Sequence, residues 1–221
     1  LGLFDAALYP RSAERLEYRS PVAEPWGSMA VADKLDLLHA ACAALAIDER
    51  IVDWSAWLGY GRVDQLLATS DGGRVAQSWE YTQPGLMAVA NAGGQTQRRH
   101  GGGADSPQQG GLERVAAGGL RQDAHRVAEE ALALLAAPEC PTGETDLILM
   151  PSQMVLQIHE SIGHPLELDR ILGDERNYAG TSFVTPEMFG RYRYGSKLLD
   201  VTFDPGVSGE LASYAADDEG T

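Results

Sequence analysis

A turn signal between two runs of strand-forming residues lies in the middle of this sequence, where residues 63–81 read VDQLLATSDGGRVAQSWEY. The four residues 70–73, Ser-Asp-Gly-Gly, are typical of a tight turn, because Asp hydrogen-bonds to its own backbone and Gly adopts positive φ angles. Val, Trp and Tyr on both sides favour strands. Residues 50–91 therefore predict a β-hairpin or a meander. We interpret the tryptophans of this region as core or cross-strand residues, with a ligand platform as the alternative.

Helices are predicted on both sides of these strands. Residues 31–47 carry an apolar stripe at helical spacing, made by Leu35, Leu38, Cys42 and Leu45. Cys42 is accordingly interpreted as a core residue. Residues 112–137 form a second amphipathic pattern, which Pro138 ends. Residues 92–111, rich in Gly, Gln and Ser, predict a loop between the strands and the second helix.

Two histidines flank a glutamate in residues 155–167, which read VLQIHESIGHPLE. His159, Glu160 and His164 form the pattern HExxxH. Neutral imidazoles are good zinc ligands, and a carboxylate beside a metal ion can accept a proton from water that the ion has made more acidic. These residue types predict a metal-dependent hydrolase site, in which the two histidines bind the metal and Glu160 is the base.

The spacing of the two histidines requires an irregular helix. In a regular α-helix, five residues turn through roughly 500°, so that the two side chains would point about 140° apart and could not share one ion. A π-bulge rewinds the turn, and Gly163 tolerates the backbone that such an insertion needs. We therefore predict a distorted helix over residues 159–164.

The alternative is that His159 and His164 are ordinary polar residues of a helix, with Glu160 solvated beside them. The preceding residues favour the metal site. Residues 145–150, Thr-Asp-Leu-Ile-Leu-Met, are interpreted as a short buried strand, and Pro151-Ser152 as the turn that caps the following helix. A strand that leads into such a helix would hold it rigidly.

The sequence resembles the TldD/PmbA family, the so-called modulators of DNA gyrase. The resemblance rests on residues 146–167, on the step Gly-Thr-Ser at 180–182 and on the loop Asp-Asp-Glu-Gly at 217–220, which follow one another in the family's order. It extends over roughly residues 28–221 and is strongest from residue 145 onward.

The resemblance implies a zinc metallopeptidase that acts on unfolded or small polypeptides, with His159 and His164 as zinc ligands and Glu160 as the general base. It also implies a dimer, formed with itself or with a related subunit that lacks the motif. The family's third ligand is a cysteine far downstream, beyond Thr221, so the chain is expected to be a fragment. Neither Cys42 nor Cys140 is at the matching position.

Four residues within the chain are candidates for a third ligand: Glu167, Asp169, His125 and Cys140. Glu167 has the best local position, one turn beyond His164, but we interpret it as a residue that orients an imidazole or forms a salt bridge. His125 is expected on the polar side of its helix. Two further functions stay open, namely a catalytically inactive scaffold or partner-binding subunit, and a hydrolase of non-peptide amides.

These patterns together predict an α+β protein, in which helices pack on an antiparallel β-sheet. Residues 1–30 contain three prolines and are predicted to be an extended connector. Residues 31–143 are predicted to be part of an N-terminal α+β domain, which ends at the Pro-Thr-Gly turn at 141–143. Residues 144–221 are predicted to begin a β-rich metallopeptidase domain that is truncated at its C-terminal end.

The formal net charge of −15 opposes direct nucleic-acid binding, because phosphate contacts need a basic surface. The local basic cluster at residues 98–100, Arg-Arg-His, is interpreted as part of a solvated loop, with phosphate binding as the alternative. Two distant cysteines fit a reducing compartment. The sequence shows no leading segment like a signal peptide and no apolar run of membrane-spanning length. A cytoplasmic protein without membrane contact is therefore expected.

Overall fold

The computed structural model describes residues 13–102, 107–117, 119–218 and 220. The chain forms two compact units. We call Leu1–Glu139 together with Asp204–Thr221 the sheet unit, and Cys140–Phe203 the helical unit. The predicted division at residues 30 and 143 into a connector and two domains stays a prediction.

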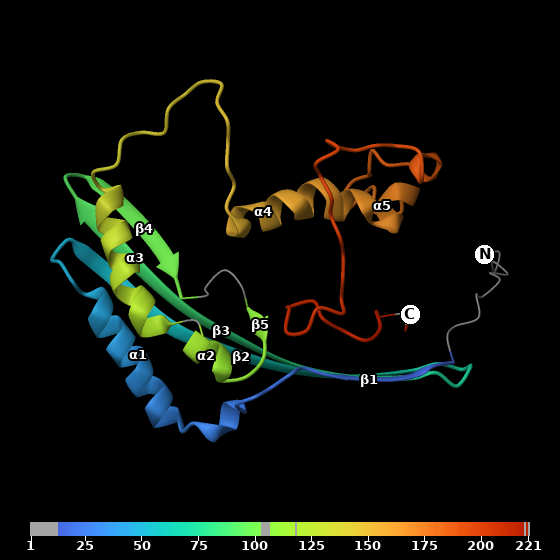
Figure 1. Ribbon diagram of the computed structural model, residues 1–221, viewed down its shortest axis with the longest axis horizontal. Helices are drawn as coiled ribbons and strands as arrows, with labels where there is room; N and C mark the ends of the chain where they lie inside the picture. The colour runs from blue at the N-terminus through green and yellow to red at the C-terminus, as the bar shows by residue number, and fades with distance from the viewer. Residues whose placement is uncertain (1–12, 103–106, 118, 219, 221) are drawn as a thin grey trace. The chain divides into compact units, whose positions relative to one another are not determined.

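A long hairpin is the centre of the sheet unit (Figure 1). Strand β2 (Ile51–Ala68) pairs antiparallel with β3 (Arg74–Ala92), and Ala68 lies opposite Arg74 at the turn. The hydroxyl of Thr69 accepts a hydrogen bond from the backbone N–H of Gly73 (3.0 Å), and Gly72 has a φ of 90°, which only glycine adopts easily. The predicted hairpin and its turn are confirmed.

Three shorter strands complete a mixed sheet of five strands, all of them paired with β3. Strand β1 (Arg15–Arg19) runs parallel to β3, whereas β4 (Gln95–Gly101) and β5 (Gln108–Gln109) run antiparallel to it. The α+β class is confirmed. The sheet is mixed rather than purely antiparallel, because β1 pairs parallel with β3. This strand lies within residues 1–30, which were predicted to be an extended connector.

Strand β4 corrects the prediction of a loop over residues 92–111. Ala92 pairs with Gln95, so Gly93 and Gly94 form a two-residue turn, with φ angles of 60° and 84°. Positive φ at both positions is the geometry of the hairpin turn that best matches the twist of the strands. The Gly-Gly pair was the signal for this hairpin in the sequence. Residues 103–106 of the predicted loop lie outside the described residues.

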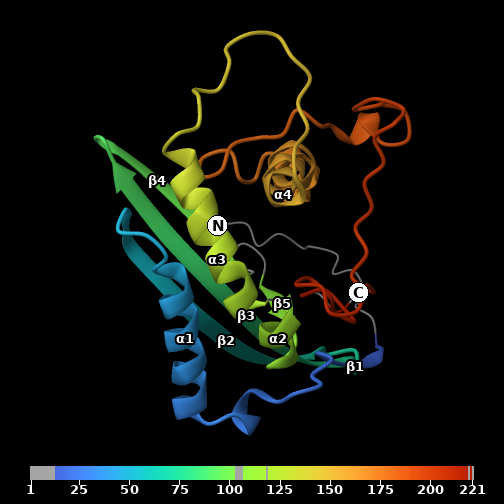
Figure 2. The same ribbon diagram turned by 60° about the vertical axis from the view of Figure 1, so that its left-hand side comes forward.

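The helices of the sheet unit pack on one face of the hairpin (Figure 2). Its helical segments are η1 (Trp26–Ser28), α1 (Val31–Leu45), α2 (Glu113–Ala117) and α3 (Leu120–Leu134). The prediction over 31–47 is confirmed by α1. The single helix predicted over 112–137 is wrong, because Gly119 takes a left-handed conformation with a φ of 57° and separates α2 from α3.

The main hydrophobic core lies between α1, α3 and the β2–β3 hairpin. Leu86, Ala88 and Ala90 of β3 point into it, because alternate residues of a strand share one face. Helix α3 contributes Ala124, Val127, Ala128 and Ala131, which are all fully buried. Alanine-rich packing keeps this helix close to the sheet.

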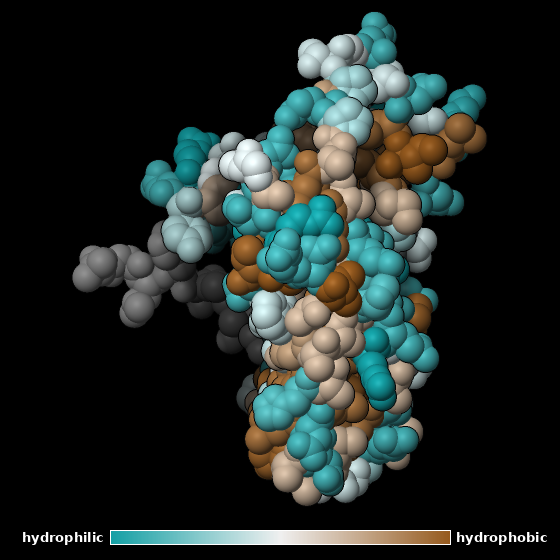
Figure 3. All heavy atoms as spheres, turned by 90° about the vertical axis from the view of Figure 1, so that its left-hand side faces the viewer, coloured by the Kyte–Doolittle hydropathy of each residue, from teal (hydrophilic) through white to brown (hydrophobic). Residues whose placement is uncertain are grey.

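The outer side of α3 is charged. Arg126 pairs with Asp123 and Glu130, and Glu130 also accepts a hydrogen bond from Arg99 of β4 (2.6 Å). His125 lies beside Glu129 on this exposed side, as predicted. Figure 3 views the protein from the side on which α1 and α3 lie in Figure 1, and hydrophilic side chains are spread over that face among hydrophobic groups. Exposed ion pairs of this kind contribute little to stability.

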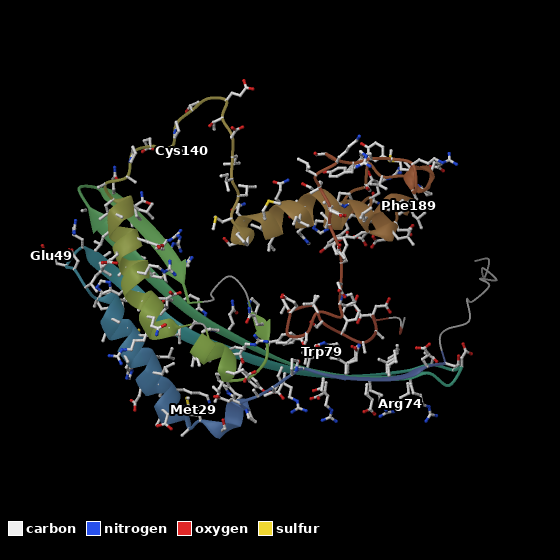
Figure 4. The ribbon with its side chains drawn as sticks, in the orientation of Figure 1. Met29, Glu49, Arg74, Trp79, Cys140 and Phe189 are labelled. Carbon is white, nitrogen blue, oxygen red and sulfur yellow. The ribbon has the colours of Figure 1, made fainter. Side chains whose placement is uncertain are left out.

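Residues 204–218, which we call the strap, belong to the sheet unit although they follow the helical unit in the sequence. The side chain of Gln77 donates to Ala216 O (2.9 Å) and accepts from the N–H groups of Ala215 (2.9 Å) and Ala216 (3.3 Å). The indole of Trp79 donates to Ser213 O (3.0 Å), and Figure 4 shows this side chain between β3 and the strap. Gln77 and Trp79 are odd-numbered residues of β3, so the strap lies on the face opposite the helical core.

Gln109 of β5 holds the strap at a second point. Its amide donates to Ser213 O (2.8 Å) and Leu211 O (3.0 Å), and its oxygen accepts from Tyr18 Oη (2.7 Å) and Ser20 Oγ (2.9 Å). The side chain is completely buried and fully hydrogen-bonded. Buried polar groups that are satisfied in this way fix a single arrangement of the chain.

The helical unit consists of short helices and irregular segments. Its helices are α4 (Pro151–Ile158), η2 (His159–Gly163), η3 (His164–Leu166), α5 (Leu168–Leu172) and η4 (Pro186–Met188). Residues 140–203, all of them described, contain no strand, so the predicted β-rich character is not observed there. The strand predicted over 145–150 is wrong. Leu147 and Ile148 are 76% and 89% exposed, since no described segment pairs with them. None of the described helices combines the length and the apolar character that a membrane span requires.

Replacing Gly85 by alanine tests the packing of the hairpin. A Cβ at this position would lie 2.2 Å from the ring of Trp57, the cross-strand neighbour. We expect Gly85→Ala to lower the free energy of unfolding by about 1–3 kcal/mol. Gly27→Ala is the control, because nothing lies within 4 Å of its added Cβ. Equal urea midpoints for the two variants would contradict this packing.

Replacing Gln77 by leucine tests the attachment of the strap. The variant loses the acceptor for the amides of Ala215 and Ala216. We expect these two amides to exchange with deuterium roughly fivefold to tenfold faster, which corresponds to about 1 kcal/mol. Gln95→Leu, on the exposed surface of β4, should leave their exchange unchanged. Unchanged exchange in Gln77→Leu would mean that other contacts hold the strap.

Candidate metal site

A single wide turn connects α4 to the rest of the helical unit. The backbone N–H of His164 donates to the carbonyl of His159, which is the i to i+5 bond of a π-helix. The predicted distortion over residues 159–164 is confirmed. It brings together the two histidines that a regular α-helix would hold about 140° apart.

Gly163 does not explain this turn in the predicted way. Its φ is −57°, which any residue adopts, and an added Cβ would make only an ordinary contact with His159 Nδ1 at 3.6 Å. Pro165 gives the better explanation. It has no N–H to donate, and its ring would clash with the carbonyl of Ser161 if the α-helix continued. Pro165 was therefore the signal in the sequence for an irregular turn.

The side chains of His159, Glu160 and His164 converge. Their possible ligand atoms all lie within 4.8 Å of one another. The two imidazole centroids are 4.1 Å apart, with an angle of 64° between the rings. His159 and Glu160 are exposed, and the side chain of His164 is 28% exposed. Within the described parts of the chain, this is the one cluster of His, Cys, Asp or Glu that could hold a metal ion.

Glu167 fixes the orientation of His164. Its Oε1 lies 2.6 Å from His164 Nδ1, and its Oε2 accepts from Arg170 Nε. The hydrogen bond from His164, followed by that from Arg170, lowers the pKa of the Glu167 carboxyl below its usual value. An ionised carboxylate only accepts hydrogen bonds, so His164 Nδ1 carries the proton and the lone pair of Nε2 is left for a metal ion. This contact agrees with the interpretation of Glu167 as an orienting residue.

Of the three remaining candidates for a third ligand, Cys140 and Asp169 do not join the cluster within the helical unit, and His125 lies in the other unit. His125 belongs to α3 of the sheet unit and faces Glu129. Cys140 is exposed, and its Sγ lies 3.9 Å from Pro141 O. The carboxylate of Asp169 accepts from the backbone N–H of Arg170 at 2.7 Å.

Residues 179–184 support the end of the wide turn. Ser182 Oγ donates to Pro165 O (2.7 Å), and its backbone N–H donates to Arg170 O (3.2 Å). Arg170 Nη1 donates to Ala179 O (2.8 Å). The Gly-Thr-Ser step at 180–182 therefore packs against the segment that carries His164 and Glu167. This supporting contact was not apparent from the sequence, because it joins residues that lie 17 positions apart.

The donor set suits a zinc-type ion. Two imidazoles with an adjacent carboxylate are typical of zinc and of other late first-row metals, whereas calcium and magnesium prefer sites made of oxygen atoms. The orienting carboxylate on the non-ligating nitrogen of His164 is the usual partner of a metal-binding imidazole. The residues present therefore fit a metal site that holds a base beside the ion.

The sequence matches the profile of the PmbA/TldA metallopeptidase central domain over residues 24–136, which is just over half of the chain. It is also similar to the metalloprotease TldD homolog of Buchnera aphidicola, with 28% identity over 86% of this chain and 38% of the relative. A metalloprotease of Methanothermobacter thermautotrophicus is 26% identical over 89% of this chain and 40% of its own length.

A metalloprotease of Methanocaldococcus jannaschii is 37% identical over 41% of this chain and 18% of its own length. The chain thus spans at most about two fifths of the length of these relatives. The profile match, which covers the α1–β2–β3–β4–α3 region, confirms the resemblance that the motifs indicated. The chain belongs to the TldD/PmbA family of metallopeptidases.

Proposed function

We propose that the protein is a zinc-dependent peptidase that hydrolyses unfolded or small polypeptides. The observation that carries this proposal is the wide turn at residues 159–164, which places two imidazoles side by side with a carboxylate next to them. The names of the similar proteins, all metalloproteases, support the same reaction class. The choice of zinc over other metals rests on the donor chemistry.

Each residue of the cluster has a distinct role in this proposal. His159 and His164 hold the ion, and zinc, when bound, polarises the scissile carbonyl and makes water a better nucleophile. The Glu160 carboxylate accepts a proton from the attacking water and later donates it to the leaving amine, so the base is regenerated. Glu167 keeps His164 in the tautomer that leaves Nε2 free, and Arg170 keeps Glu167 in place.

The proposed substrates follow from the family and fit the exposure of the cluster. Because His159 and Glu160 are exposed, an extended polypeptide could reach them without opening a buried cavity. We also propose a dimer, with a second copy or with a related subunit that lacks the motif. The net charge of −15 disfavours direct nucleic-acid binding, so a link to DNA gyrase would have to be indirect. A cytoplasmic location fits the two free cysteines.

Replacing Glu160 by glutamine separates catalysis from metal binding. We expect hydrolysis of an unstructured fluorogenic peptide to fall by roughly 100-fold or more, because general-base catalysis is lost, while the bound zinc is retained. Glu144→Gln, at an exposed site of the same unit, is the control and should keep full activity. A wild-type rate in Glu160→Gln would remove Glu160 from the mechanism. Zinc binding without hydrolysis by the wild type would favour the inactive scaffold.

Replacing Glu167 by alanine tests the orientation of His164. We expect the zinc affinity to fall by about 10–100-fold, because the carboxylate that holds the imidazole is removed. The measurement is a competition titration against a chelator of known affinity. Asp169→Asn is the matched control, since Asp169 contacts the backbone of Arg170 and not a histidine. An equal loss of affinity in both variants would contradict the assigned role of Glu167.

A further inference from the structure

Strand β2 leaves one long edge of the sheet open. It pairs with β3 along its whole length, and none of the other described strands pairs with it. Its 18 residues contain no lysine and no proline, and its only charged residues are Asp53, Arg62 and Asp64. Unpaired N–H and C=O groups in a row form a template for another strand, and natural proteins usually protect long edges with lysine, proline or a covering segment.

Several large apolar side chains are exposed near the hairpin end of β2, beside the charges of Arg62 and Asp64. Val63 and Leu66 are 49% and 62% exposed, and Tyr60 is also on the surface. A covering strand would remove these side chains from water. The occupant must therefore offer a strand, apolar side chains and charges that match Arg62 and Asp64.

A second copy of β2 meets these conditions in one register. In an antiparallel pair with a two-fold axis at Val63, Arg62 lies opposite Asp64 of the second copy, and Asp64 lies opposite its Arg62. Opposite charges in directly facing positions stabilise a strand pair. Both groups are charged at neutral pH, since the hydrogen bond from Arg62 lowers the pKa of Asp64 to about 2.

The sizes of the facing side chains also match in this register. The remaining pairs on each side of the axis join Gly61 to Gln65, Tyr60 to Leu66, Gly59 to Leu67 and Leu58 to Ala68. Each glycine therefore faces a long side chain, and nothing in the chain itself lies within 4 Å of a Cβ placed on Gly61. Tyr60 and Leu66 form an aromatic–aliphatic pair of the kind that stabilises sheets.

Neighbouring registers are less favourable. Two strands that keep their helical faces on the same side of a continuous sheet must have the axis at a residue, since side chains alternate between faces. An axis at Arg62 places two arginines opposite each other, and an axis at Asp64 places two aspartates opposite each other. An axis at Gly61 leaves Arg62 opposite Tyr60 and Asp64 opposite Leu58, so neither charge finds a partner.

We propose that two copies of this chain associate through the free edges of β2, antiparallel about Val63, so that the two sheets become one continuous sheet. Such a contact uses the same surface on both copies and closes as a dimer rather than growing into a fibre. It rests on the dimer proposed above, whose contact surface it names, and it is independent of the metal site, because it uses only residues of the sheet unit.

Charge reversal in two separate variants tests the register. In Arg62→Asp, two aspartates face two aspartates across the interface, and in Asp64→Arg, two arginines face two arginines. We expect each variant to dissociate with a Kd raised by roughly tenfold or more over the wild type. An equimolar mixture of the two restores both opposite-charge pairs and should return to dimer mass. The measurement is light scattering coupled to gel filtration over a range of concentrations.

The mixing experiment separates the interface from effects within one chain. Arg62 also pairs with Asp64 of its own chain (2.9 Å), so each variant loses this contact as well, and mixing cannot restore it. Arg74→Asp, on β3 and away from the edge, is the control and should remain dimeric. A wild type that stays monomeric at all concentrations, or a mixture that stays monomeric when the wild type is dimeric, would overturn the proposal.

A cysteine at the two-fold axis gives a second test that does not depend on charge. In a Cys140→Ser background, which removes the exposed native thiol, Val63→Cys should form a disulfide-linked dimer on mild oxidation. Val52→Cys is the control, because the pairing of the two β2 strands ends where residue 58 faces Ala68, so residue 52 lies beyond it and faces no cysteine. Equal cross-linking of the two variants, or none at residue 63, would contradict the register.

Discussion

The pairing of β2 with β3 is the contact on which the sheet unit depends. Its register sets which residues of β3 face α1 and α3 and which face the strap, because side chains alternate along a strand. A slip by one residue would turn Leu86 and Ala88 away from the core and Gln77 away from the strap. The ring of Trp57 across Gly85 opposes such a slip, since glycine is the only residue that leaves room for it.

The helical unit depends on a different constraint, the wide turn that Pro165 imposes after α4. The i to i+5 bond between His159 and His164 decides that their side chains share one side of the helix. The contacts of Glu167, Arg170 and Ser182 then hold that arrangement from the C-terminal side. The proposed metal site needs few residues, and His159, Glu160 and His164 lie close together in the sequence. For that reason its geometry could be inferred from spacing alone.

The features that the sequence predicted correctly are local. The hairpin, α1 and the wide turn each follow from residues that contact one another within a few positions. The features it missed depend on partners far along the chain or on backbone details. The loop predicted over 92–111 is wrong because Gly93 and Gly94 form a tight hairpin turn that leads into β4. The single helix predicted over 112–137 is wrong because Gly119 has a left-handed conformation. Residues 145–150 have the composition of a buried strand, but no described strand pairs with them. The strap was not foreseen, because two buried glutamines give no hydrophobic pattern.

The metal content of the purified chain decides whether the wide turn forms a metal site. Plasma emission or native mass spectrometry would be carried out on the wild type beside His164→Ala, without added metal. We expect about one zinc per chain in the wild type and its loss in the variant. No metal in either protein, or equal metal in both, would contradict the claim that His159 and His164 together bind the ion.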